Sequence, residues 1–137
     1  ISYGHWRLSE GTAAEAGDKT RAALDAGMSM IDTASIYGYP SFGAAEALLG
    51  DVLKAEPSLR DRMVLATKAG IYPPTPYDCT PDMIVKTCEE SLRRMNTDVI
   101  DVFYIHRPDM LTPHADVAGG LMRLVESGKA REIAVSN

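Results

Sequence analysis

Short apolar runs alternate with longer amphipathic stretches along this 137-residue chain, and this alternation limits the possible fold more than any other feature. The apolar runs are too short and too rich in β-branched residues to be helices, so they indicate strands. The stretches between them keep roughly a 3.6-residue spacing, which indicates helices. The predicted strands are 1–6, 29–33, 63–69, 99–106 and 133–135, and the predicted helices are 12–26, 44–55, 81–95 and 116–127.

Residues with special backbone preferences mark the ends of these elements. Gly27 follows the first helix, where a glycine in the left-handed conformation commonly ends a helix. Pro57 ends the second helix because proline lacks the N–H that a helix interior needs. Thr80 is expected to be an N-cap residue before Pro81 at the first helical position, and Gly128 ends the fourth helix. The chain therefore reads as four strand–helix units and a fifth strand.

The order of elements leaves two candidate folds. Strands that are each separated by a helix must be parallel, and right-handed crossovers then give a doubly wound sheet or a TIM barrel. A doubly wound nucleotide fold commonly has a G-x-G-x-x-G turn after its first strand, and none is present here. Polar or reactive side chains instead end the strands, as in TIM-barrel enzymes: Trp6, Arg7, Asp32, Lys68, His106, Ser136 and Asn137. The sequence therefore predicts an α/β fold of the parallel (β/α)8 barrel type.

The length of the chain corresponds to only part of such a barrel. A complete TIM barrel has about 250 residues. An open half-barrel would leave its first and fifth strands as unpaired edges, which promote aggregation. We therefore expect residues 1–137 to be the amino-terminal part of a single TIM-barrel domain, contributing the first four βα units and the fifth strand.

Composition and charge narrow the range of partners. The net charge is −5 and no basic block is present, so the sequence gives no sign of binding nucleic acid or an anionic membrane. A small molecule is the expected partner. Cys79 and Cys88 are the only cysteines, and they form neither a C-x-x-C motif nor a secreted-type framework. No stretch resembles a signal peptide or a membrane span, so we expect a cytoplasmic protein.

Three of the strand-end residues and Tyr37, in the loop after the second strand, make a useful chemical combination if their side chains converge on one rim. Each has an ordinary structural explanation when taken alone, such as capping a turn or filling the barrel mouth. Together, the ammonium of Lys68 would stabilise the phenolate form of Tyr37, and the carboxylate of Asp32 would pair with that ammonium. The imidazole of His106 would donate a hydrogen bond to a carbonyl oxygen and stabilise a developing alkoxide. The set suits the reduction of a carbonyl group.

Several motifs resemble the aldo-keto reductase family, in its order and at about its spacing. They are MIDTASIYG (30–38), TKAG (67–70), IHRPD (105–109) and AVSN (134–137). The segment GHWRL (4–8) is similar to one bacterial branch of the family. Together they extend the resemblance over essentially the whole chain. The family usually has glycine at the position of Ala134, so this residue is a small departure from its pattern.

The resemblance implies a function and a role for each matched residue. It implies NADPH-dependent reduction of an aldehyde or ketone, with NADPH favoured over NADH. Tyr37 corresponds to the general acid, Lys68 to its activating cation, Asp32 to the partner of that cation, and His106 to the residue that orients the carbonyl. Ser136 and Asn137 correspond to the pair that holds the nicotinamide carboxamide. Position alone places Trp6 near the nicotinamide or the substrate, with core packing as the alternative, and assigns Arg7 with Trp6 to the cofactor side of the mouth.

Two other functions stay open at this point. Lys68 could be a Schiff-base nucleophile, as in aldolases that place a lysine on a barrel strand, although Asp32 would favour its charged form. The chain could also be a catalytically inert remnant, or a relative that binds cofactor as a regulatory subunit. The carbonyl substrate and the oligomeric state are left open.

Other conspicuous residues receive weaker interpretations. His5 lies either at the barrel mouth or in the core, and His114 is expected in the loop before the fourth helix. No metal-ligand spacing connects the histidines and cysteines, so no metal site is predicted. The loop containing Tyr72 and Tyr77 either faces the substrate or is simply a rigid, proline-rich connection. The remaining charged cluster, 89–94, has the i, i+4 spacing of a solvated helix face.

Overall fold

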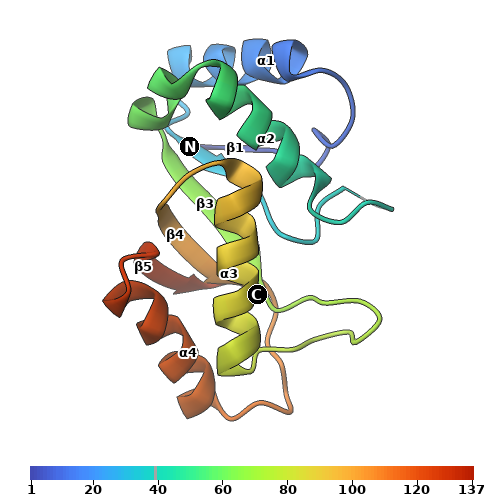
Figure 1. Cartoon of the computed structure of the whole chain (residues 1–137), viewed down its shortest axis with the longest axis vertical. Coiled ribbons are helices and arrows are strands. Elements are labelled where there is room, and N and C mark those ends of the chain that lie inside the picture. The colour runs from blue at the N-terminus through green and yellow to red at the C-terminus, as the bar shows by residue number, and fades with distance from the viewer. Residues whose placement is uncertain (39) are drawn as a thin grey trace.

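Strands and helices alternate along the chain in the computed structural model, which describes residues 1–38 and 40–137 (Figure 1). The strands are β1 (Ser2–Gly4), β2 (Met30–Asp32), β3 (Val64–Ala69), β4 (Ile100–Ile105) and β5 (Ala130–Val135). The helices are α1 (Ala13–Asp25), α2 (Ala44–Ala55), α3 (Pro81–Met95) and α4 (His114–Glu126), and a short 3₁₀ helix, η1 (Pro57–Arg62), follows α2. The predicted loop 35–43 includes Tyr39, which lies outside the described residues.

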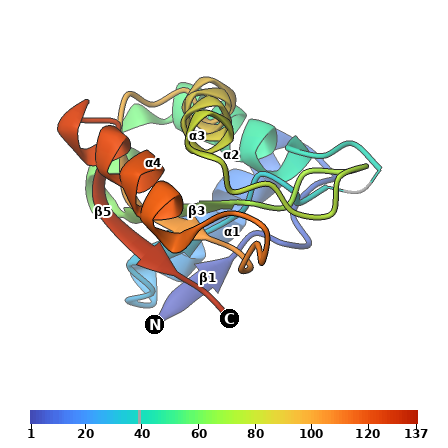
Figure 2. The same ribbon diagram turned by 90° about the horizontal axis from the view of Figure 1, so that it is seen from below.

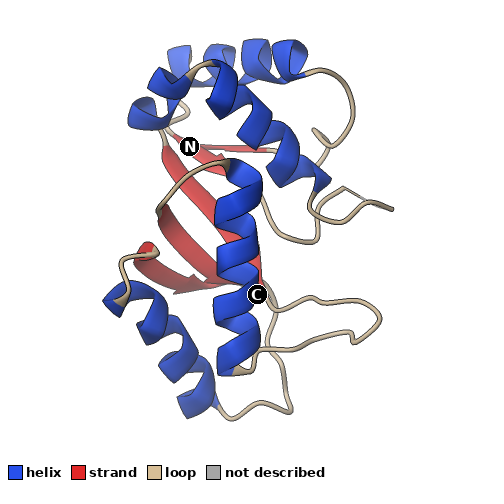
Figure 3. Cartoon of the chain, viewed as in Figure 1, coloured by secondary structure: helices blue, strands red, loops and turns tan. Residues whose placement is uncertain are grey.

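The five strands form one parallel sheet in the order in which they occur in the sequence, β1-β2-β3-β4-β5 (Figure 3). Helices α2, α3 and α4 lie on one side of the curved sheet (Figure 2), and each helix contacts the next along the chain. A doubly wound sheet would reverse its strand order and place helices on both faces. The observed order is that of part of a (β/α)8 barrel, which confirms the predicted fold class.

The two faces of the sheet have different roles because side chains alternate along each strand. One face packs against the helices, and its side chains, such as Leu65 and Phe103, are fully buried with Leu49 and Ile84 in the main core. On the opposite face Lys68 lies next to Tyr104, its register partner on β4. The outer, helix-facing side of the sheet therefore forms the hydrophobic core, and polar residues such as Lys68 lie on its inner side.

Strand β1 ends at Gly4, two residues before its predicted end, and three further differences concern later elements. Helix α4 begins at His114, so the interpretation of His114 as a loop residue was wrong. Strand β5 begins at Ala130 because its pairing with Ile100 starts there, although the charged residues at 131–132 hid this from the apolar pattern. The segment after Pro57 forms η1, where only the end of a helix was predicted. The predicted cap at Gly27 is confirmed by its φ of +82°.

Candidate active site

The side chains of Lys68 and Asp32 form an ion pair at the carboxyl ends of β3 and β2. The Lys68 Nζ donates to both carboxylate oxygens of Asp32 at 2.7 Å, and to the backbone oxygen of Thr33 at 2.8 Å. Three acceptors thus satisfy the three donors of the ammonium group. The exposed fraction of the side chain is 10% for Lys68 and 26% for Asp32, so the pair is largely shielded from solvent. A lysine this buried needs such partners to keep its charge.

Tyr37 lies over this ion pair because of the loop after β2. Its ring centroid is 5.3 Å from the Lys68 Nζ. Gly38, the next residue, has a φ of +109°, and a Cβ there would lie only 2.6 Å from the Cβ of Ala44. Only glycine fits so close a turn, which explains why the motif MIDTASIYG ends as it does. The backbone oxygen of Tyr37 also accepts hydrogen bonds from Gly43 at 3.0 Å and Ala45 at 3.4 Å.

His106 completes the cluster from the end of β4. Its ring packs edge-on against the Tyr37 ring, with centroids 5.7 Å apart. The pKa of His106 is lowered from 6.5 to about 4, mainly by burial and in part by the Lys68 and Arg107 cations, while Asp32 opposes this shift. Its Nδ1 atom is buried and has no hydrogen-bond partner among the described residues. The imidazole is therefore neutral at pH 7, with one N–H available for a carbonyl oxygen.

The residues predicted on the cofactor side surround this cluster. Trp6 is 63% exposed, and its ring centroid is 6.5 Å from that of Tyr37, so it borders the site. Arg7 stacks on Trp6, with its Cζ 5.5 Å from the ring centroid. The Asn137 Nδ2 donates to the backbone oxygen of His106 and to the Ser136 Oγ, both at 2.9 Å. The structure thus brings the predicted site residues to one rim, with Arg7 at its margin.

His5, by contrast, belongs to the core. Its side chain is fully buried, its Nε2 lies 3.4 Å from the Thr20 Oγ1, and its ring packs edge-on against Tyr3. Of the two interpretations left open by the sequence, the structure supports packing. Burial lowers the pKa of His5 from 6.5 to about 4.

The low pKa of His5 predicts a loss of stability in acid. Because the unfolded chain binds this proton more readily than the folded one, stability is complete above pH 6.5 and falls until the pH reaches about 4. The shift corresponds to about 3 kcal/mol of unfolding free energy. His5→Gln should remove this part of the pH dependence in urea unfolding measured across that range. The control His114→Gln, at an exposed position, should keep the wild-type slope. Equal slopes for His5→Gln and wild type would contradict the prediction.

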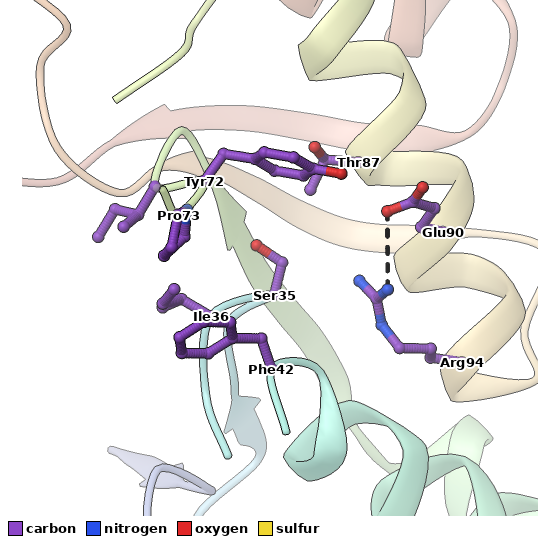
Figure 4. A pocket seen from close by; sticks show the side chains of 9 residues that line it. Ser35, Ile36, Phe42, Tyr72, Pro73, Thr87, Glu90 and Arg94 are labelled. Carbon is purple, nitrogen blue, oxygen red and sulfur yellow. Dashed lines mark ion pairs between the residues drawn. The ribbon is translucent and has the colours of Figure 1, made fainter. Parts of the chain in front are cut away.

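A pocket of about 230 Å³ lies behind the Tyr37 loop, between that loop, the loop after β3 and helix α3 (Figure 4). The hydroxyl-bearing side chains of Tyr72 and Thr87 lie on one side of it and Ile36 and Phe42 on the other, with Ser35 between them. The ammonium of Lys86 lies over the Tyr72 ring, 5.6 Å from the ring centroid. The loop after β3 therefore shapes this outer pocket, and Tyr77 is exposed and does not line it.

One charged residue of helix α3 is not on a solvated face. Arg94 is 26% exposed, and its Nε donates to the Glu46 Oε2 at 2.7 Å, while the Glu46 side chain is fully buried. The interpretation of the 89–94 cluster as a solvated face was therefore wrong for Arg94. The sequence feature that could have indicated a buried partner for Arg94 is Glu46, which lies at helical spacing with the apolar Leu49 and Leu53.

The described part of the chain has neither a metal-binding cluster nor a membrane-spanning helix. Within residues 1–38 and 40–137, no three His, Cys, Asp or Glu side chains are grouped so that they could hold a metal ion. In the same residues no helix has the length and apolar character needed to cross a membrane. Cys79 and Cys88 are both free and buried.

Comparison with known proteins places these features in context. The family model described as "Aldo/keto reductase family" matches residues 1–137. The whole chain is 53% identical to a 6-dehydroglucose reductase of Novosphingobium aromaticivorans and covers 47% of it. Over 85% of its length the chain is 36% identical to an L-glyceraldehyde 3-phosphate reductase of Escherichia coli, covering 35% of that protein. The chain thus spans about half or less of the length of these curated relatives.

A solved structure supports the same assignment of fold. The glycerol dehydrogenase of Gluconobacter oxydans matches 99% of this chain with a TM-score of 0.84 and 35% sequence identity. The match covers 44% of that protein. The backbone arrangement and the sequence therefore point to the same group of proteins.

Proposed function

The chain belongs to the aldo/keto reductase family, and from this premise we propose that the protein carrying it reduces an aldehyde or ketone to an alcohol with NADPH. The observation that supports the proposal most is the convergence of Tyr37, Lys68 and His106 on one rim, with Asp32 holding the lysine. Relatives named for the reduction of 6-dehydroglucose and of L-glyceraldehyde 3-phosphate support a carbonyl compound as the substrate.

In the proposed reaction the protein supplies a proton and stabilises charge. The neutral imidazole of His106 donates a hydrogen bond to the carbonyl oxygen and orients it. As the carbonyl carbon accepts a hydride, the Tyr37 hydroxyl gives its proton to the oxygen, which becomes the hydroxyl of the product. The phenolate that remains is stabilised by the ammonium of Lys68, whose charge Asp32 maintains. Lys68 and His106 thus assist the proton transfer from Tyr37, and Asp32 assists Lys68.

The residues beside the cluster fit a nicotinamide cofactor, which supplies the hydride when bound. A carboxamide needs one acceptor and one donor, and the Ser136 hydroxyl and Asn137 amide offer both at the end of β5. The exposed Trp6 ring provides an apolar surface beside Tyr37. In the proposal these three side chains hold and orient the cofactor, with Arg7 at the edge of the same surface.

A Schiff-base role for Lys68 has less support. A nucleophilic amine must lose its proton, whereas the Lys68 Nζ donates to three oxygen atoms, two of them carboxylate oxygens. This environment favours the charged ammonium. The same environment is the one required for an activating cation beside a tyrosine.

The proposal also includes the setting in which the protein works. We propose a cytoplasmic enzyme with a small carbonyl compound as its partner, without a role in binding nucleic acid or membranes. The acidic net charge of −5 and the two free, buried thiols support this.

Oxidation of NADPH tests the proposed function. The protein carrying this chain is expected to consume NADPH with small aldehydes, ketones or oxidised sugars as substrates, forming one alcohol per NADPH. The same assay with NADH is expected to give a lower kcat/KM. Fluorescence titration without a carbonyl compound should show NADPH binding. NADPH binding without turnover of any carbonyl compound would support the regulatory alternative, and the absence of both would contradict the proposal.

A further inference from the structure

A buried ion pair lies directly behind the candidate active site, on the helix-facing side of the sheet. Glu46 is in the first turn of α2, its side chain is fully buried, and both of its carboxylate oxygens are occupied. The Oε2 accepts from the Arg94 Nε at 2.7 Å, and the Oε1 accepts from the Thr67 Oγ1 at 2.6 Å. A charge without solvent requires partners of this kind, so the position of the carboxylate is strongly fixed.

One side of the ion pair is attached to the strand that carries Lys68. Thr67 precedes Lys68 on β3, and consecutive side chains point to opposite faces of a strand. The Thr67 hydroxyl bonds the carboxylate on the outer face, while Lys68 bonds Asp32 on the inner face. A shift of Thr67 along or across the sheet must therefore move Lys68 as well.

The other side of the ion pair is attached to the loop that carries Tyr37. The Arg94 side chain covers the backbone at Gly43, where an added Cβ would lie 2.8 Å from the Arg94 Cδ. Gly43 in turn donates its N–H to the Tyr37 backbone oxygen at 3.0 Å. Figure 4 shows Arg94 extending from α3 on the side of the pocket opposite the Tyr72 loop, with its ion-pair partner Glu90 above it.

From these contacts we propose that the Glu46–Arg94 pair and Thr67 are positioning residues, which set the distance between Lys68 and Tyr37 at the rim. Helix α2, strand β3 and helix α3 meet at this one carboxylate. Lys68 is linked to it through the adjacent Thr67, and Tyr37 is linked to it through Arg94 and Gly43. In this role the three residues act through Lys68 and Tyr37 and not on the reacting atoms. The inference rests on the proposed function, because it concerns the residues assigned to that reaction.

Thr67→Val is the sharpest variant, because valine keeps the shape of threonine and removes only the hydroxyl. Misplacement of Lys68 relative to Tyr37 should lower kcat by about tenfold to a hundredfold. The affinity for NADPH, from fluorescence titration, should stay close to that of wild type. Thr67→Ser restores the hydroxyl and should recover most of the lost kcat. The matched control is Thr20→Val, which removes another fully buried hydroxyl, one that bonds the Ala16 oxygen at 2.8 Å on α1.

A second readout does not depend on turnover. The titration of His106, followed by NMR, has a midpoint that the nearby Lys68 ammonium helps to lower. Thr67→Val should move this midpoint upward, while Thr67→Ser and Thr20→Val should leave it near the wild-type value. If Thr67→Val does not fold, Glu46→Gln, which keeps the size of the side chain and removes its charge, is measured in the same two ways.

The outcomes separate this inference from the proposed function. Loss of kcat and an upward midpoint in Thr67→Val alone support the positioning role. A Thr67→Val protein that matches Thr20→Val in both readouts overturns it. If the wild-type protein reduces no carbonyl compound, the proposed function fails, and the NMR titration alone decides: a moved midpoint supports the coupling of Thr67 to the rim, and an unmoved one overturns it.

Discussion

Tyr37→Phe is expected to lower turnover by about 10²- to 10⁴-fold, the range associated with a positioned general acid. Phenylalanine keeps the ring that packs against His106 at 5.7 Å and removes the only proton that Tyr37 can give to a carbonyl oxygen. The fold around Gly38 should not change, because the loop is held by backbone hydrogen bonds from Gly43 and Ala45. NADPH oxidation with a fixed carbonyl substrate measures the loss, and fluorescence titration should show NADPH bound as in wild type.

Tyr104→Phe is the matched control for this variant. The Tyr104 ring lies 6.0 Å from the Lys68 Nζ, close to the 5.3 Å found for Tyr37, so both phenols neighbour the same cation. Only Tyr37 also packs against His106. Tyr104→Phe should therefore keep most of the activity. A fully active Tyr37→Phe protein, or a loss confined to Tyr104→Phe, would show that the wrong tyrosine has been assigned as the acid.

The fold was predictable from the sequence because its signals are local. Each apolar run and each amphipathic stretch indicates a strand or helix with a buried face, and the pattern of these segments predicted the order of strands and helices correctly. Gly27 and Pro81 marked helix ends through their backbone conformations, which do not depend on distant residues. Strand β5 was placed late because Arg131 and Glu132 interrupt its apolar pattern, and pairing with β4 determines where it starts.

The residues of the candidate site could be predicted from the sequence, but the contacts around them could be predicted only in part. Residues at strand ends converge because parallel strands share one rim, which sequence order alone can indicate. The burial of His5 and of Arg94 depends on contacts with Thr20 and Glu46, each more than ten residues away in the chain. The helical spacing of Glu46 with Leu49 indicates that Glu46 is buried, but no local pattern identifies the distant partner in either contact. The same applies to the coupling of Thr67 to Glu46, whose hydrogen bond spans 21 positions.

Lys68→Met is expected to reduce turnover as strongly as Tyr37→Phe, since the phenolate then forms without its neighbouring cation. Asp32→Asn should have a smaller effect and lower turnover by about tenfold to a hundredfold. The Lys68 ammonium still has two acceptors in this variant, the Thr33 backbone oxygen at 2.8 Å and the amide oxygen of the new side chain. Loss of the carboxylate leaves a shielded cation without its counter-charge, so Asp32→Asn should also unfold at lower urea concentration. Both kcat and the urea midpoint are measured for each variant.

The double variant Lys68→Met/Asp32→Asn distinguishes a single unit from two independent groups. If Asp32 acts only by holding the charge of Lys68, it has nothing left to do once the lysine is gone. The double variant should then have the kcat of Lys68→Met alone, and its urea midpoint should exceed that of Lys68→Met, in which the Asp32 carboxylate is left without its cation. Additive losses in kcat would instead mean that Asp32 contacts the reacting groups directly. In that case the 2.7 Å ion pair would describe only part of the role of Asp32.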